Sequence, residues 1–330
     1  MTLALVTGAA GQDGIYLCRQ LAAAGVSVLA GVQGLDTASP GGSTCSTSAA
    51  ADGRVASASE RIETYLRHPR ITVVPLDITD TAVFAALLRA HRVDEIYNLA
   101  ALSSVAHSWD DPRSTATVNA DAVGGMLAAV RHVRPTARFF QASSVQAGTS
   151  SPYASSKLAA EGLVADARAA GLFALCGRLA NHESPLRPAH FVSRRIARAA
   201  AAGEVLDLGA LDAERDWGHA RDHVAAMPLL LRLAEPVDAD ICTGVVRPLR
   251  DLVWAAYRAA GLPADDFVVE SPGTPRPEDP VSVSGDPAEL HRTTGWAPTT
   301  SVEELMAEMV AVERERAASG LEDASSYLTL

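Results

Sequence analysis

Cysteine is scarce in this chain of 330 residues, and the few cysteines that it has exclude several kinds of site. Their spacings match neither a CxxC redox motif nor a zinc-binding pattern, so no metal site is expected. We predict reduced thiols in a cytoplasmic protein, with all but the second cysteine acting as small core residues. The four residues are Cys18, Cys45, Cys176 and Cys242.

Basic residues and long apolar runs are also in short supply. The chain has 28 Lys and Arg against 39 Asp and Glu, a net charge of −11, and no basic stripe, which argues against a nucleic-acid partner. No apolar run has the length of a membrane span, so no membrane partner is expected. The first residues, MTLALVTGAAG, lack the basic segment of a signal peptide.

What the chain does contain is an alternation of short apolar runs and helical patterns in its first half. With 48% hydrophobic residues, it can bury a substantial core. The alternation predicts the α/β class, with a Rossmann-type doubly wound parallel sheet. Buried strands are expected at 3–8, 26–32, 71–77, 95–100, 138–144 and 173–180. Helices are expected near 12–24, 80–91, 113–132 and 153–170.

This alternation weakens after residue 180, which predicts a domain boundary. Residues 1–180 are assigned to a dinucleotide-binding domain and residues 181–330 to a smaller, mixed α/β substrate domain. The run ICTGVV at 241–246, within 236–247, is compatible with a return to the main sheet. Residues 34–59 are small and polar, so a flexible insertion is predicted there. Further helices are expected near 190–202, 219–233, 248–261 and 301–316.

The stretch VTGAAGQDG places three glycines in the spacing GxxGxxG, between a predicted strand and a predicted helix. Glycines there permit a tight turn and let a pyrophosphate approach the backbone at the helix N-terminus. An ordinary glycine turn is the alternative, but the motif in this context favours dinucleotide binding. The loop residues predicted to bind the dinucleotide are Gly8, Gly11, Gln12, Asp13 and Gly14.

The choice between NAD and NADP depends on the end of the second strand. An acid there favours a free ribose hydroxyl, and an arginine favours the 2′-phosphate. Here Gln33 and Gly34 are followed by Asp36. Because no arginine is present, NAD is predicted and NADP stays the alternative. Asp77, at the end of the third strand, is placed to meet the adenine or to cap the following helix.

Tyr153 and Lys157, in PYASSK, are four residues apart and so share one face of a predicted helix. A lysine beside a tyrosine stabilises the phenolate, which takes a proton from a substrate hydroxyl as hydride leaves its carbon. Ser144, at the end of a strand, is placed to hydrogen-bond the same oxygen. YxxxK alone is common on solvent-facing helices, but its place after the glycine loop favours the catalytic interpretation.

The glycine loop, the serine-ended strand and YASSK together resemble the extended short-chain dehydrogenase/reductase superfamily. Longer stretches resemble the GDP-mannose 4,6-dehydratase family, and they cover most of the chain with gaps at 34–59 and 146–151. Of these, NHESP and RDWGHA are specific to the family rather than shared by the superfamily. The stretches are TGAAGQDGIYL, EIYNLAALSSV, FFQAS, ANHESPLRPAHFVSRRIAR, LGALDAERDWGHARD and RPEDPVSVSGD.

The resemblance implies a transient oxidation. A nicotinamide takes hydride from C4 of a nucleotide-linked hexose, a base removes the acidified C5 proton, water leaves from C6, and hydride returns. The family uses a threonine, a glutamate, a tyrosine and a lysine. Tyr153 and Lys157 match directly, and Ser144 replaces the threonine. Gln146 stands where the family has glutamate, and an amide has no titratable form with which to act as a base.

The connection between Gln146 and Tyr153 is also shorter than in the family, so the site is expected to be more open or to be covered by another element. Three residues are candidates for the missing base. His107 has a suitable unperturbed pKa but is expected at the surface. Glu183, inside NHESP, is expected to be structural. Tyr153 itself, acting on a differently turned substrate, is the favoured candidate.

The resemblance further implies a set of residues for the nucleotide diphosphate, its ribose and its base. Arginine suits this because its fork of donors pairs with phosphate oxygens. The alternative is pairing with nearby carboxylates, such as Arg215 with Glu214 or Asp216. Leu186 and His190 depart from the family pattern, which leaves the guanine preference open. The predicted substrate residues are Ser103, Asn181, Val192, Arg195, Arg215, Arg276 and Asp279. The further cofactor residues are Ile78, Leu99 and Ala100.

Three functions are compared on these grounds. The first is a dehydratase of a nucleotide sugar or nucleoside, yielding a 4-keto-6-deoxy sugar or an exocyclic 5,6-alkene similar to nucleoside-antibiotic chemistry. The second is a nucleotide-sugar 4-epimerase or 4-keto reductase, which needs no glutamate. A non-catalytic dinucleotide-binding protein is least favoured, because the tyrosine-lysine pair is intact. The superfamily implies a homodimer through helices near 113–132 and 153–170.

Overall fold

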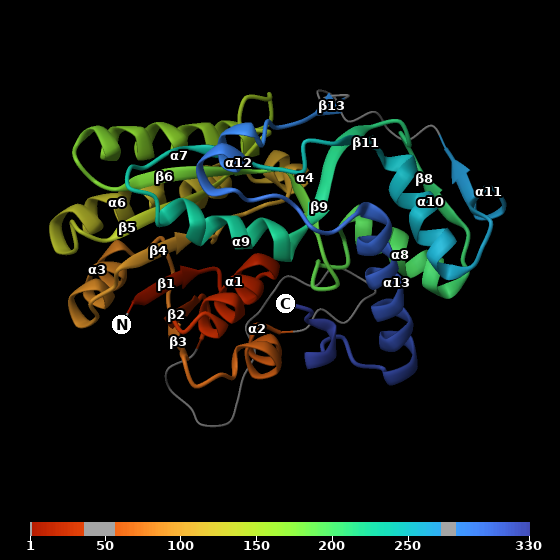
Figure 1. The fold of residues 1–330 in the computed structure, drawn as a ribbon, viewed down its shortest axis with the longest axis horizontal. Coiled ribbons are helices and arrows are strands. Elements are labelled where there is room, and N and C mark those ends of the chain that lie inside the picture. Colours follow the sequence, from red (N-terminus) through yellow and green to blue (C-terminus); the bar gives the residue numbers. More distant parts are fainter. Residues whose placement is uncertain (1, 36–56, 272–281) are drawn as a thin grey trace.

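The architecture is built on a seven-stranded parallel sheet (Figure 1). In the computed structural model, which describes residues 2–35, 57–271 and 282–330, its strands run in the order β10-β6-β5-β4-β1-β2-β3. This order confirms the predicted Rossmann-type doubly wound sheet, because the chain steps outward from β1 in both directions. The strands are β1 (Leu3–Thr7), β2 (Ser27–Val32), β3 (Ile71–Pro75), β4 (Glu95–Asn98), β5 (Arg138–Ser144), β6 (Ala174–Leu179) and β10 (Ala239–Ile241).

Helices cover both faces of this sheet because apolar residues point to both sides of each strand. Ala4 and Val6 of β1 pack with α1 and α9, whereas Leu5 packs with α3, α6 and α7. The first face carries α1 (Gln12–Ala23), α9 (Ala220–Leu231), α2 (Ala58–Arg61) and the π-helix η1 (Ile62–Leu66). The second carries α3 (Thr81–Ala90), α4 (Val105–Asp110), α5 (Pro112–Ala116), the π-helix η2 (Thr117–Asp121), α6 (Ala122–Val133) and α7 (Pro152–Ala169).

The second half of the chain forms a smaller mixed unit beside the carboxyl end of the sheet (Figure 1). Its core is made by Ile196, Leu252 and Met306, from three helices that pack together. Its strands are β7 (Asn181–Glu183), β8 (Leu206–Leu208), β9 (Glu214–His219), β11 (Val246–Pro248), β12 (Val268–Glu270) and β13 (Ser282–Val283). Its helices are α8 (Val192–Ala202), α10 (Leu249–Ala260), α11 (Ala264–Phe267) and α13 (Val302–Ser319); α12 (Ala288–Thr294) packs on α9, and the 3₁₀ turn η3 (Ser325–Tyr327) follows.

The return to the main sheet considered for 236–247 is made by β10, so only the first residue of the run 241–246 lies in that sheet. The chain leaves the central sheet after Ile241 and joins β9 of the second unit at Val246. Between Ile241 and Val246, the Asp216 carboxylate accepts hydrogen bonds from the backbone N–H groups of Thr243 (3.0 Å) and Gly244 (2.7 Å). Gly244 has a positive φ of 77°. This turn redirects the chain, so the apolar run contributes to two different sheets.

The helix expected near 113–132 is also interrupted. A π-helical turn, η2, separates α5 from α6, and Asn119 within it bonds Leu102 and Ser156. These contacts tie the helix to the loop after β4 and to α7. The buried thiols of Cys18, Cys176 and Cys242 are free, as predicted, and most of the predicted insertion at 34–59 lies outside the described residues.

The C-terminal residues fold back from the second unit onto the first. The hydroxyl of Tyr65, in η1, donates to Asp323 at 2.8 Å, although 258 residues separate the two. Arg316, near the end of α13, donates to the carbonyl oxygen of Pro185 at 2.7 Å. Arg61 lies 3.9 Å from Asp323, so the last part of the chain holds elements from both units together.

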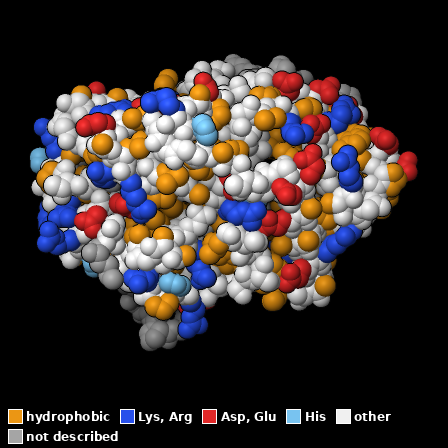
Figure 2. All heavy atoms as spheres, in the orientation of Figure 1, with side chains coloured by type: hydrophobic (Ala, Val, Ile, Leu, Met, Phe, Trp, Pro, Cys, Tyr) orange, Lys and Arg blue, Asp and Glu red, His pale blue; other side chains and the backbone are white. Residues whose placement is uncertain are grey.

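Basic and acidic side chains are interspersed on the face that Figure 2 shows, without a stripe of one sign. Such a surface offers no electrostatic track for a phosphate backbone on that side. Within the ranges that the structure describes, no helix combines the length and apolarity required to cross a membrane.

Candidate functional site

A cleft of 1240 Å³ lies where the central strands end and the second unit begins. Its walls include residues that follow β1, β2, β3, β4 and β6, together with the last residues of β5. The carboxyl edge of an open parallel sheet is the usual place for a ligand in this class of fold. The opposite wall comes from residues 181–195 and 208–217, so both units contribute to the cleft.

The glycine loop closes one end of the cleft, and two of its glycines have no room for a side chain. Gly8 has a positive φ of 66°, and a Cβ there would lie 2.9 Å from the backbone nitrogen of Ala100. A Cβ on Gly14 would collide with the carbonyl oxygen of Gly8. Gly11 precedes the first turn of α1, whose N–H groups therefore face the cleft beside the loop, as a pyrophosphate requires.

Every residue predicted to bind the dinucleotide lines this cleft. Asp77 accepts hydrogen bonds from Gln33 Nε2 at 2.9 Å and from Thr79. Partial burial opposes ionisation of Asp77, but the Thr79 and Gln33 bonds lower its pKa overall. Asp77 and Gln33 thus place one carboxylate and one amide together on the cleft wall. Cleft-lining members of the set are Gly8, Gly11, Gln12, Asp13, Gly14, Gln33, Asp77, Ile78, Leu99 and Ala100.

Tyr153, Lys157 and Ser144 converge in the middle of the cleft. Pro152 starts α7 and the Ser151 hydroxyl caps it, which places Tyr153 and Lys157 in its first two turns. Lys157 Nζ donates to the carbonyl oxygen of Ala142 at 2.9 Å and lies 5.7 Å from the centre of the Tyr153 ring. The three side chains needed for proton removal at a hydroxyl therefore meet at one point.

Burial governs the acidities of this pair. It raises the pKa of Tyr153, against an opposing hydrogen bond with Ser144, and it lowers the pKa of Lys157 to about 8. In the protein alone, burial therefore favours the neutral phenol of Tyr153, and the lysine-stabilised phenolate stays a prediction for the filled cleft. The nearby Arg187 charge acts in the other direction, lowering the pKa of Tyr153.

Gln146 lies on the cleft wall in the turn that follows β5. Its backbone N–H donates to the Ser144 hydroxyl at 3.1 Å, and its carbonyl accepts both bonds of Thr149 at 2.9 Å. These contacts hold the turn through its backbone and leave the amide side chain in the cleft. No Asp, Glu or His occurs between residues 142 and 157, so this segment carries no carboxylate.

On the substrate side, the described members of the predicted set also line the cleft. Arg215 is buried in β9 and donates to the carbonyl oxygen of Glu214 at 2.7 Å. The Asp216 carboxylate instead accepts hydrogen bonds from the backbone N–H groups of Thr243 and Gly244. Arg276 and Asp279 lie outside the described residues. Cleft-lining members of the set are Ser103, Asn181, Val192, Arg195 and Arg215.

Three further predictions concerned residues around this set. Leu186 is buried and does not line the cleft, whereas His190 does. His107 lies on α4 with an exposed side chain, 3.9 Å from Asp110, and stays outside the cleft wall. Glu183 accepts from the Ser193 hydroxyl at 2.6 Å, consistent with the structural role expected for it.

Asp13 has a partner that the sequence did not predict. His182 Nε2 lies 2.9 Å from Asp13 Oδ2, and its Nδ1 lies 2.7 Å from the carbonyl oxygen of Ala180. Gln12 joins them by donating to Asp13 and to the His182 carbonyl. Because both atoms facing the imidazole are acceptors, the geometry fits a doubly protonated ring beside a carboxylate. Residues 169 positions apart gave no sequence signal for this pair.

Two arginines on the cleft wall were also missed. Arg187 lies 3.0 Å from Glu183 and stacks on the Phe191 ring at 3.7 Å, and Arg61 donates to the carbonyl oxygen of Leu186 at 3.2 Å. Both line the cleft, and the Arg187 charge acts on Asp13 beside the glycine loop, where cations suit a diphosphate. Arg187 is part of the NHESPLR stretch, so its position next to the predicted set was the available signal.

Ala210, on the cleft wall, has a positive φ of 47° that is unfavourable for a residue with a Cβ. Ala210→Gly is therefore expected to raise the free energy of unfolding by about 1 kcal/mol, measured by urea denaturation. Ala311→Gly, at an exposed position inside α13, is the matched control and should lower it by about 1 kcal/mol. If both variants had a lower free energy of unfolding than the wild type, the conclusion that Ala210 is strained would be wrong.

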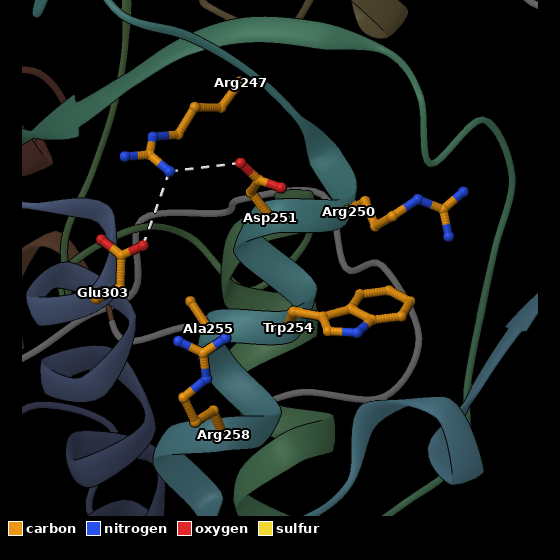
Figure 3. Close-up of a pocket in the computed structure, with 7 residues that line it drawn as sticks. All are labelled: Arg247, Arg250, Asp251, Trp254, Ala255, Arg258 and Glu303. Carbon is orange, nitrogen blue, oxygen red and sulfur yellow. Dashed lines mark hydrogen bonds and ion pairs between the residues drawn. The ribbon is translucent and has the colours of Figure 1, made fainter.

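A second hollow, of 290 Å³, lies on α10 and shares no wall residue with the cleft (Figure 3). Arg247 reaches both Asp251 at 3.4 Å and Glu303 at 3.7 Å, so its charge is neutralised within the hollow. Arg250 points away from this pair, toward Asp212 at 3.1 Å and Glu270 at 3.4 Å. Arg250 of α10 thus forms ion pairs with two carboxylates, Asp212 and Glu270, that line the cleft.

Comparison with known proteins gives the same assignment for nearly the whole chain. The family model described as GDP-mannose 4,6 dehydratase matches residues 5–309. The GDP-mannose 4,6-dehydratase of Sinorhizobium fredii is 35% identical, over 93% of this chain and 95% of its own.

Solved structures share the fold at lower identity. A dTDP-glucose 4,6-dehydratase from Streptomyces venezuelae, with NAD bound, has a TM-score of 0.78 and 23% identity, and the match covers 96% of this chain and 98% of that one. RMD from Pseudomonas aeruginosa, complexed with NADPH, has a TM-score of 0.74 and 21% identity, over 96% and 100%. These two proteins carry a nicotinamide dinucleotide in the same fold.

Proposed function

We propose, from the premise that this chain belongs to the GDP-mannose 4,6-dehydratase family, that it dehydrates a nucleotide-linked sugar or a nucleoside by transient oxidation. It is a nicotinamide-dependent enzyme of the extended short-chain dehydrogenase/reductase type. The observation that carries the proposal is the convergence of Tyr153, Lys157 and Ser144 in the cleft that the glycine loop closes. Other enzymes also carry these three side chains, so the reaction class is assigned by family membership and not by the side chains alone.

The proposed roles follow from the contacts. When bound, the dinucleotide supplies a hydride acceptor and donor, and the glycine loop with Asp77 would hold it. The Tyr153 phenolate takes the proton of the sugar hydroxyl, and Ser144 orients that hydroxyl by a hydrogen bond. Lys157, fixed by the carbonyl oxygen of Ala142, supplies the positive charge that favours the phenolate when the cleft is filled.

The substrate-binding residues are proposed for the nucleotide. Arg195 and Arg215 suit phosphate oxygens, and Asn181 and Val192 lie on the same wall. Residues 1–180 are proposed as the dinucleotide domain, to which β10 is added, and 181–330 as the substrate domain. In this proposal the dinucleotide binds one wall of the cleft and the substrate nucleotide binds the other. The reacting ends of the two molecules then meet at Tyr153.

Gln146 distinguishes this chain within its family. We propose that proton removal from C5 uses a group other than residue 146, since an amide does not titrate near neutral pH. The product is either the 4-keto-6-deoxy sugar or an exocyclic 5,6-alkene, which forms when hydride returns to the ketone of the alkene intermediate. The alkene version places the enzyme in a nucleoside-antibiotic pathway.

The same residue supports a second candidate function, a nucleotide-sugar 4-epimerase or 4-keto reductase. Both reactions require the hydroxyl, tyrosine and lysine groups but no carboxylate at position 146. The mass of the product separates the candidates. Loss of one water supports dehydration, an isomer of unchanged mass supports epimerisation, and a gain of two hydrogens supports reduction of a keto sugar.

The test is to purify the protein, identify its dinucleotide by mass spectrometry, and incubate it with GDP-mannose, other nucleotide sugars and a panel of nucleosides. NAD is the proposed cofactor, because the described end of β2 offers Gln33 rather than an arginine. Recovery of NADP would overturn that choice. A protein that binds no dinucleotide and converts no compound of the panel would overturn the enzyme proposal.

Gln146→Glu is expected to raise dehydration of GDP-mannose by about 10²-fold or more, because a carboxylate at this cleft position supplies a general base. The rate of water loss is measured by mass spectrometry. Gln20→Glu introduces the same change on α1, outside the cleft wall, and should leave that rate unchanged. Equal rates for the wild type and Gln146→Glu would show that position 146 does not limit the reaction.

We also propose a cytoplasmic homodimer. The dimer would pair α5, η2, α6 and α7 of one protomer with the same helices of its partner. Leu158 on α7 and Trp109 on α4 support this, since their side chains are 55% and 50% exposed on neighbouring helices. The free buried thiols of Cys18, Cys176 and Cys242 support a reducing compartment.

A further inference from the structure

The proposed dehydration requires a proton acceptor for C5, and the catalytic segment does not contain one. Between residues 142 and 157 the only titratable groups are Tyr153 and Lys157. Tyr153 is committed to the sugar hydroxyl in the proposed mechanism, and Lys157 is held by a backbone carbonyl. The acceptor must therefore be sought among the other titratable groups on the cleft wall.

Three carboxylates of the wall are already occupied by donors. Asp13 is bound by His182 and Gln12, and Asp77 by Gln33 and Thr79. Glu183 is buried, accepts from Ser193 at 2.6 Å, and lies 3.0 Å from the Arg187 guanidinium. A carboxylate that accepts several such bonds is a weak base, because those bonds favour its ionised form.

Among the described residues, the remaining carboxylates of the wall are Asp212 and Glu270, which share one cation. Arg250 lies 3.1 Å from Asp212 and 3.4 Å from Glu270, and Glu270 also accepts the Leu211 N–H at 3.1 Å. His182 has an acceptor at each ring nitrogen, so the geometry leaves it no lone pair for a substrate proton.

His190 is different from all of these. It lies on the cleft wall, and within the described part of the chain its ring nitrogens have no hydrogen-bond or ion-pair partner. Its ring packs on Phe191 with centroids 4.4 Å apart, and Arg187 lies 3.7 Å from the centre of that same Phe191 ring. The phenyl ring positions the imidazole without occupying either nitrogen.

The electrostatic setting of His190 also suits a base. Partial burial, assisted by the charge of Arg187, lowers its pKa below the ordinary 6.5, so the ring is neutral at physiological pH. Arg187 is the charged group that acts on it, and the same charge acts on Tyr153. The charge of one guanidinium therefore acts on both His190 and Tyr153. Val192 and Arg195 line the same cleft.

We propose that His190 is the general base that removes the C5 proton in this enzyme, in place of a carboxylate at position 146. This rests on the proposed dehydratase function. The neutral imidazole takes the proton, the C5–H electron pair forms the C5–C6 double bond, and the C6–O bond breaks. The proton on the imidazole passes to the departing hydroxide, so water leaves and His190 returns to its neutral form.

The test uses His190→Asn in the full-length enzyme with its bound dinucleotide and the compound from the panel that the wild type dehydrates. Water loss and solvent deuterium incorporation at C5 should fall by about 10²- to 10⁴-fold. Reduction of the bound dinucleotide in a single turnover should persist, because Tyr153 still removes the hydroxyl proton. His107→Asn, on the exposed face of α4, is the control and should behave like the wild type.

Two further readouts separate a catalytic role from a structural one. In the wild type, kcat should rise with pH through a pKa below 6.5, and this limb should be absent in His190→Asn. The Cε1 proton resonance that disappears in His190→Asn should titrate with the same pKa in the wild type. A variant that exchanges and dehydrates at the wild-type rate would overturn the proposal for His190 alone. A wild type that yields only an isomer would overturn the dehydratase function with it.

Discussion

Tyr153→Phe is expected to lower kcat for water loss by about 10²- to 10⁴-fold, the range for loss of a positioned proton-transfer group. The phenylalanine keeps the buried ring beside Lys157 and removes only the hydroxyl that meets Ser144. Hydride transfer should fail as well, since the sugar hydroxyl loses its proton acceptor. Both steps are measured together, by product mass and by the absorbance of the reduced dinucleotide in a single turnover.

Tyr257→Phe is the matched control for this experiment. Tyr257 is a buried tyrosine of α10 whose hydroxyl donates to the Glu204 carbonyl at 2.7 Å, and it does not line the cleft. Its loss should cost about 1 kcal/mol of unfolding free energy and leave kcat unchanged. A Tyr153→Phe enzyme that retains its kcat would remove Tyr153 from the mechanism.

Asp13→Ala is expected to have the largest effect on stability, because it removes one partner of a partly buried ion pair. Breaking such pairs costs about 3–5 kcal/mol, and the 24% exposure of Asp13 places this pair near the lower value. The control is Asp251→Ala, which removes a half-exposed partner of Arg247 and should cost less than about 1 kcal/mol. Both variants are compared by urea denaturation at fixed ionic strength. Equal losses in the two would contradict a special role for the pair.

The effect of Asp13→Ala should also depend on pH in a defined direction. Burial opposes ionisation of Asp13, but His182 and Gln12 lower its pKa below the ordinary 3.8, so its stabilisation is present above that value and lost in acid. Burial opposes protonation of His182, but Asp13 raises its pKa above 6.5, so that contribution is complete below 6.5 and lost at higher pH. The difference between wild type and variant should therefore be greatest between about pH 4 and 6.5.

The parts of the fold that sequence analysis predicted are those fixed by local chemistry. The alternation of apolar strands and helices gave the central sheet, because each strand is buried on both faces. Close backbone contacts leave room only for glycine at positions 8 and 14. The spacing of four residues places Tyr153 and Lys157 on one face of a helix. Such features need only a few neighbouring residues, which a sequence displays directly.

The parts that were missed depend on contacts between distant segments. The strands of the second unit have two to six residues, too few to show a clear period. Asp13 lies in α1 and His182 in β7, a strand of a different sheet from β1, so the two residues meet only in the folded chain. From the sequence, His190 was noted only as a departure from a family pattern. Its free nitrogens become apparent once the other bases on the described part of the cleft wall are seen to be paired.

The contact between Tyr65 and Asp323 has a consequence for how the protein is made. It closes a loop of 258 residues, which is entropically costly and forms late relative to the local contacts of the sheet. During synthesis the glycine loop and α7 leave the ribosome well before residues 316–323, which supply the acceptor for Tyr65 and the acidic neighbour of Arg61. The nascent chain therefore completes its cleft wall at Arg61 only after residues 316–323 have been synthesised.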